Sequence, residues 1–124
     1  IGEITRLKGF HEDWMLARWL EDLAERTADQ TDAERLKQVA ESLRINVIGT
    51  KLMLIVSELS EALESLRDTG YRDIRVRGNF VEELADAEIR IKDLSSMIKV
   101  DLGKAETEKI RKNASRPYKH GRVV

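Results

Sequence analysis

The chain has 124 residues, of which 41% are hydrophobic, so it can build one packed core but not two independent ones. Its net charge of -1 gives no general attraction to a nucleic acid polymer or an anionic membrane, and no apolar run reaches the roughly 18 residues of a membrane span. Cysteine is absent, which excludes disulfides, thiolate zinc sites and cysteine nucleophiles. We therefore expect a single cytoplasmic domain over residues 1–124, without nucleic acid or membrane partners.

The sequence predicts an all-α fold, and three helices are expected in its first half. The only proline is Pro117, and aromatic residues make up 5%, which favours helix over sheet. We predict a first helix over 11–27 and a second from Thr31 to about residue 43, with Glu34 completing a capping box. A third helix is predicted over 46–67 from apolar residues at helical spacing: Ile48, Leu52, Ile55, Val56, Leu59, Leu63 and Leu66.

Two more helices are expected after a basic connection. Gly70 is predicted to cap the third helix, and the connection over 69–78 holds three arginines against one aspartate. A fourth helix is predicted to follow Asn79 as its cap and to run to about residue 99, and a fifth to run from Asp101 to residue 113 or 114. Short connections between helices of this length are typical of a four-to-five-helix bundle.

Two pairs of acidic residues are the main candidates for a site. Glu58 and Glu61 lie on the third predicted helix and Glu83 and Asp86 on the fourth, and each pair is spaced i, i+3, so its carboxylates share a face. If these helices pack antiparallel, four carboxylates converge and repel one another unless a cation compensates. Hard cations such as Mg²⁺ take oxygen ligands. The alternative is a set of solvated surface acids, which a chain with 23 Asp and Glu residues places in pairs by chance.

Neighbouring residues narrow the choice of site. A di-iron centre of the Glu-x-x-His type needs a histidine three residues after a glutamate, and neither His11 nor His120 has that spacing. Arg90 lies between Asp86 and Asp93 on the fourth predicted helix. It either forms a structural salt bridge with Asp86 or Asp93, which we favour, or reaches a phosphate group of a substrate.

The near-zero net charge hides an acidic body and a basic tail. Residues 1–103 hold 15 Lys and Arg against 21 Asp and Glu, a net of -6, whereas residues 104–124 hold 7 against 2, a net of +5. In the tail, Lys109, Asn113 and Arg116 share a face if the fifth helix continues that far. Basic side chains beside an acidic metal site are what a polyphosphate ligand requires, although a solvated tail is the alternative.

Three segments of the sequence resemble a known family. They are SELSEALE at 57–64, EELADAEIRIKDL at 82–94, and the pattern K-x-x-x-N-x-x-R-P-Y-K-H-G over 109–121. Together they are similar to the MazG-like nucleotide pyrophosphohydrolases, members of the all-α NTP pyrophosphatase superfamily that also includes the dimeric dUTPases. The resemblance covers residues 46–121 and carries the order E-x-x-E, then E-x-x-D, of that family.

The resemblance implies an activity and a role for each matching residue. The family cleaves nucleoside triphosphates, ribo or deoxy, between the α and β phosphates, giving a monophosphate and pyrophosphate. By position, Glu58, Glu61, Glu83 and Asp86 are expected to bind Mg²⁺, for which Mn²⁺ can substitute, and Glu58 or Glu61 is the candidate general base. The candidate substrate-binding residues are Lys109, Asn113, Arg116, Tyr118, Lys119, Arg90 and Asp93.

The resemblance also implies an assembly, but it leaves several alternatives open. The family forms dimers, or tetramers of two dimers, whose sites use residues from more than one copy. A catalytically inactive nucleotide-binding relative and a helical protein-interaction module remain as alternatives. The base is not predicted, because residues 1–45 match no recognisable pattern; Trp14 and Trp19 either stack on the base or pack in the core, which we favour.

Overall fold

The described part of the chain is an arrangement of four α-helices and one short 3-10 helix. A computed structural model describes residues 2–116, with side chains from residue 9 onward. Among these residues the structure contains no strand, which confirms the all-α prediction, and no helix is both long and apolar enough to cross a membrane. The elements are α1 (Gly2–Arg26), α2 (Gln30–Thr69), η1 (Tyr71–Asp73), α3 (Phe80–Met97) and α4 (Leu102–Ser115).

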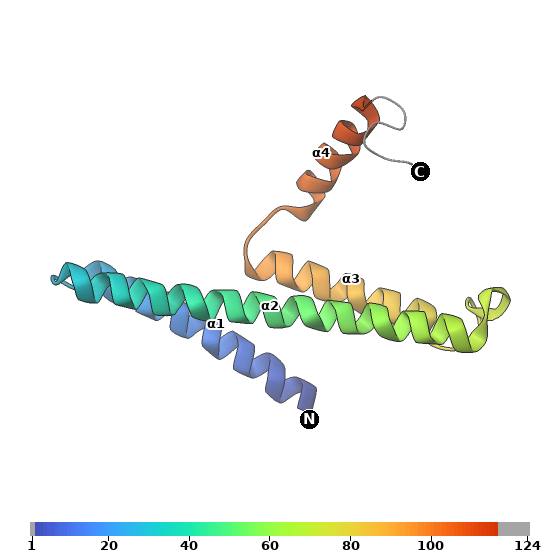
Figure 1. Cartoon of the computed structure of the whole chain (residues 1–124), viewed down its shortest axis with the longest axis horizontal. Helices are drawn as coiled ribbons and strands as arrows, with labels where there is room; N and C mark the ends of the chain where they lie inside the picture. The colour runs from blue at the N-terminus through green and yellow to red at the C-terminus, as the bar shows by residue number, and fades with distance from the viewer. Residues whose placement is uncertain (1, 117–124) are drawn as a thin grey trace.

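The long helix α2 organises the fold (Figure 1). Helix α1 runs back along the N-terminal half of α2, and α3 runs back along its C-terminal half. Helix α4 extends away from the other three, and every one of its residues is exposed. The predicted fifth helix is therefore present, with Asp101 as its N-cap accepting a hydrogen bond from the Lys104 N–H at 2.9 Å, but none of its residues is buried against the rest of the described chain.

The prediction of separate second and third helices is wrong, because α2 is one helix of 40 residues. Gly49 does not interrupt it, since one glycine costs only about 1 kcal/mol and helices pack on both halves of α2. The predicted cap is also wrong: Asp29, not Thr31, accepts the hydrogen bond from the Asp32 N–H, at 3.1 Å. The far end agrees with prediction, as Gly70 takes a φ of 81° and its N–H donates to the Leu66 carbonyl at 2.8 Å.

The buried core is thin and consists mostly of small residues. Alanines at the contact of α1 with α2 let the two helices approach closely, whereas Ile55, Ala87 and Leu94 form the cluster between α2 and α3. The buried residues are Ala17, Ala24, Ala33, Ala40, Val47, Ile55, Ala62, Ala87 and Leu94. No large side chain among the described residues is fully buried, so a single chain leaves much of its apolar surface in contact with water.

A second apolar stripe on α2 is left half-exposed by the part of the chain that the structure describes. Leu52, Val56, Leu59 and Leu63, which we call the exposed α2 stripe, are 45% to 50% exposed. Val56 and Leu63 each follow a buried residue by one position, so the stripe lies about 100° around the helix from the face that α1 and α3 cover. Isolated chains rarely keep a continuous apolar surface of this kind, which usually marks an interface.

Candidate functional site

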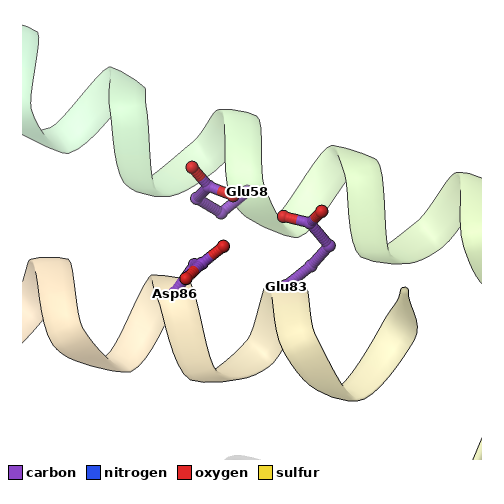
Figure 2. Close-up of side chains that lie close together, drawn as sticks. All are labelled: Glu58, Glu83 and Asp86. Atoms are coloured by element: carbon purple, nitrogen blue, oxygen red, sulfur yellow. The ribbon is translucent and has the colours of Figure 1, made fainter. Parts of the chain in front are cut away.

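Three of the four predicted acids converge between α2 and α3. Glu58 points down from α2, and Glu83 and Asp86 point up from two consecutive turns of α3 (Figure 2). Each of the three offers a carboxylate oxygen, and these oxygens lie within 4.8 Å of one another. We call these three residues the acidic triad. It forms because α2 and α3 run antiparallel side by side, which sets the two i, i+3 pairs opposite each other.

The fourth acid, Glu61, lies outside the triad and is exposed, one turn further along α2 than Glu58. It is nevertheless close enough to act on Glu83. Proximity to the Glu58 carboxylate, then removal from water, and then proximity to Glu61 together raise the pKa of Glu83 to about 7. Three of the four predicted carboxylates thus meet at one point, and Glu61 lies beside them.

Glu83 carries the feature that fits a cation. Its Oε2 atom is buried and has no hydrogen-bond partner among the described residues. A buried carboxylate oxygen without a donor is unfavourable, and a proton or a metal ion relieves it. The surrounding ligand set is made of oxygens from carboxylates, which suits a hard divalent cation such as Mg²⁺.

Arg90 supports the triad from α3. Its Nε donates to Oε1 of Glu58 at 3.1 Å, and the two side chains are only 24% and 13% exposed. The favoured prediction of a salt bridge for Arg90 is confirmed, and Glu58 on the neighbouring helix is a partner. Asp93 pairs with Lys51, whose Nζ lies 3.0 Å from its Oδ2. The guanidinium therefore neutralises one carboxylate of a crowded group.

A groove of about 830 Å³ runs from the triad along α3 toward the C-terminal end of that helix. Helices α1 and α3 form its sides, and we call it the α1–α3 groove. Asp86 belongs both to the triad and to this groove. Four Lys and Arg side chains line the groove against the two carboxylates of Asp86 and Asp93, although residues 1–103 are acidic overall: Arg18, Lys51, Arg90 and Lys99. The groove thus concentrates positive charge beside the triad.

Sequence reasoning missed Arg18, Lys51 and Lys99. Arg18 and Lys99 are far apart in the sequence and meet only because α1 and α3 pack on the same helix. Lys51 did carry a signal, since it precedes Glu58 by seven residues and so shares its face of α2, two turns away. Its side chain is 12% exposed, and its ammonium lies 5.6 Å from the centre of the Phe10 ring.

The two tryptophans have different surroundings. Trp14 is half-buried and lines the α1–α3 groove, and the Arg44 guanidinium lies 4.3 Å above its ring. Arg44 also donates its Nε to Oε2 of Glu21 at 2.8 Å, a hydrogen bond that lowers the pKa of Glu21. Trp19 is 54% exposed, so the prediction that both tryptophans pack in the core is wrong for Trp19.

Those predicted tail residues that the structure describes are not brought to the triad of their own chain. Lys109 and Asn113 are on α4, which extends away from the site (Figure 1). Arg116 is the C-cap after the end of α4, so the helix does not continue through it. Tyr118, Lys119 and His120 lie outside the described residues.

No protein-family model, no curated protein and no solved structure matches this chain. A function must therefore be argued from the triad, the groove and the exposed surfaces.

Proposed function

We propose that this chain is a Mg²⁺-dependent nucleoside triphosphate pyrophosphohydrolase, which cleaves a ribo- or deoxyribonucleoside triphosphate to its monophosphate and pyrophosphate. The observation that carries the proposal is the acidic triad, in which a buried oxygen of Glu83 has no donor. The resemblance of residues 57–64 and 82–94 to MazG-like enzymes supports the same residues. We further propose that Mn²⁺ can replace Mg²⁺ and that the enzyme acts in the cytoplasm.

Within this proposal each carboxylate has a role. Glu58, Glu83 and Asp86 would hold the metal, which would supply neutralisation of phosphate charge and activation of a water. Arg90 holds the Glu58 carboxylate in position. Glu61 is exposed beside Glu83 and outside the triad, so we assign it, rather than Glu58, as the general base that takes the proton of the attacking water.

The α1–α3 groove supplies the charge that a nucleotide requires. A triphosphate must be neutralised and aligned before its anhydride bond can break, and preorganised cations contribute to both. Lys51 lines the groove that starts at Asp86, and it is held in place by Asp93. A highly anionic ligand is therefore accommodated on a chain whose first 103 residues are acidic overall.

We propose that the active unit is a homodimer, or a tetramer built from two dimers. The exposed α2 stripe and the exposed helix α4 are surfaces that a second copy would cover. Helix α4 extends away from the other helices of its chain (Figure 1). In this proposal Lys109, Asn113 and Arg116 therefore reach the triad of another copy. The substrate-binding roles proposed for the tail, including Tyr118 and Lys119, depend on this assembly.

The direct test is hydrolysis of the eight common ribo- and deoxyribonucleoside triphosphates with Mg²⁺ or Mn²⁺, measuring monophosphate and pyrophosphate. We expect turnover of at least one, and loss of turnover in Glu61→Gln and Asp86→Asn with helical content unchanged. Glu82→Gln is the matched control, because Glu82 is an exposed acid next to Glu83. Failure of the wild type on all eight nucleotides, or full activity in either site variant, would contradict the assignment.

A helical protein-interaction module is the second candidate, and the exposed apolar surface favours it. The two candidates differ in their response to ligands. An enzyme or an inactive nucleotide-binding relative melts at a higher temperature when Mg²⁺ and a nucleotide are added together, whereas an interaction module does not. Turnover then separates the enzyme from its inactive relative.

A further inference from the structure

Lys99 has a backbone conformation that disfavours a side chain. Its φ is 58°, and it is the one residue other than glycine with a positive φ in the described part of the chain. It follows α3 in a Schellman motif, with its N–H bonded to the Ser96 carbonyl at 3.2 Å and the Val100 N–H bonded to the Ser95 carbonyl at 3.0 Å. Glycine is the usual residue at this position, so the lysine is there at a cost in stability.

The side chain of Lys99 lies where two grooves meet. It lines the α1–α3 groove and also a second groove of about 960 Å³ between α1 and α2. Trp14 and Arg18 also line both grooves. No ion pair or side-chain hydrogen bond involves Lys99 within residues 9–116. A strained residue whose charged group is not used by the fold is typical of a binding position.

The direction of the groove indicates which part of a nucleotide Lys99 meets. On α3 the groove extends from Asp86 to Met97, eleven residues of helix or about 16 Å. Asp86 belongs to the triad, where the phosphates bind under the proposed function. The opposite end of the nucleotide is its base. The base therefore lies near Trp14, Arg18 and Lys99.

We propose that Lys99 determines base specificity by donating a hydrogen bond to an exocyclic oxygen of the base, so that oxo bases are preferred over amino bases. This inference rests on the proposed function. The ammonium of Lys99 and the guanidinium of Arg18 only donate hydrogen bonds, so an amino group on the base finds no acceptor in them. Asp93, the carboxylate further along this wall, already binds Lys51. These two side chains therefore favour an oxygen over an amino group at that position of the base.

The test compares bases that differ at one exocyclic group. Inosine and adenosine triphosphates differ in oxygen against amino at the six position, and uridine and cytidine triphosphates differ in the same way at the four position. We expect the wild type to favour the oxo member of both pairs by about tenfold or more in kcat/KM, in deoxy or ribo form. In Lys99→Gly both ratios should approach one, mainly through KM, because the residue is remote from the triad.

Stability gives an independent readout in the same variants. Lys99→Gly should melt at or above the temperature of the wild type, because glycine adopts a positive φ without strain. Lys99→Arg should retain the base preference. Lys92→Ala is the control, since Lys92 is an exposed lysine of α3 that pairs with Glu88 outside both grooves.

Each result decides the inference. An unchanged base ratio in Lys99→Gly, a wild type without preference in either pair, or a lower melting temperature in Lys99→Gly would overturn it while leaving the proposed function intact. If the wild type hydrolyses no nucleotide, the proposed function fails and this inference fails with it. If both kcat/KM ratios approach one in Lys99→Gly and keep their wild-type values in Lys92→Ala, the inference is supported.

Discussion

Replacing Arg90 by methionine tests what holds the carboxylates of α2 and α3 together. The guanidinium of Arg90 lies 3.1 Å from Glu58, and Glu58 has a carboxylate oxygen within 4.8 Å of oxygens of both Glu83 and Asp86. Methionine keeps much of the length and apolar volume of the side chain but removes the charge and the donors. In the metal-free variant the three carboxylates of the triad then repel one another without the Arg90 guanidinium to neutralise Glu58.

The burial of the pair sets the size of the effect. Removing one partner of a fully buried ion pair costs about 3–5 kcal/mol, because the other charge is left uncompensated. The Arg90 and Glu58 side chains are 24% and 13% exposed, so water screens part of this loss. We therefore expect Arg90→Met to lower the free energy of unfolding by about 2–4 kcal/mol without metal. That corresponds to a fall of roughly 8–15 °C in Tm for a chain of this size.

Urea unfolding in EDTA at one fixed protein concentration measures this change, and a double-mutant cycle isolates the pair. The variants are Arg90→Met, Glu58→Gln and the combination, which should lose less than the sum of the two. Arg18→Met is the control, because Arg18 lines the same groove but is exposed and has no ion pair within the described residues. A loss below about 0.5 kcal/mol in Arg90→Met, or strict additivity, would refute the reasoning.

Three further predictions concern other parts of the molecule. The pKa of Glu83 is raised from 4.5 to about 7. Without metal, the stability that the protonated Glu83 carboxyl contributes is therefore complete below pH 4.5 and is lost as the pH rises through about 7. Glu83→Gln should remove this loss, seen as a Tm difference from wild type in EDTA that grows from pH 5 to pH 8. Leu59→Glu should convert the proposed oligomer to a monomer in light scattering, because it places a charge in the exposed α2 stripe. Asp101→Ala should destabilise α4 by about 1 kcal/mol and lower helical circular dichroism in that monomer.

Each of these has an outcome that contradicts it. Parallel pH profiles for wild type and Glu83→Gln would show that the carboxylates do not interact as placed. A wild type that is monomeric in light scattering would contradict the proposed assembly. Helical circular dichroism unchanged by Asp101→Ala would mean that the cap does not determine the start of α4.

Local signals predicted the helices and their ends where the cause is itself local. Asp101 and Gly70 act through hydrogen bonds within a few residues, and both were identified from the sequence. The continuity of α2 depends instead on packing along its whole length. Its buried residues Ala33, Ala40 and Val47 recur every seven positions through the expected break, so the helical phase already linked the two segments. This repeat of buried positions is formed by two alanines and a valine rather than by large apolar residues, because alanines form the contact with α1.

The candidate site also has features that local sequence signals predict and features that depend on how the helices pack. The i, i+3 spacing of Glu58 with Glu61 and of Glu83 with Asp86 is a local property, and antiparallel packing of two neighbouring helices brings three of them together. Glu61 remains outside because the triad is made where α3 faces α2, and its side chain is exposed. The groove could not be predicted, since it requires the position of α1 relative to α3, and no pattern in one helix encodes that.

The exposed α2 stripe, the exposed helix α4 and the triad all indicate that a second copy of the chain is needed. One chain provides the triad and a cationic groove, but α4, which carries Lys109 and Asn113 of the basic tail, extends away from both (Figure 1). If the tail contacts phosphates, as the proposed function requires, it does so in another copy, and the exposed α2 stripe is the apolar surface that can hold that copy in place. Leu59→Glu should then abolish turnover while the triad stays intact and still binds Mg²⁺. An active monomer would show that the groove alone neutralises the triphosphate and that the tail has no part in the reaction.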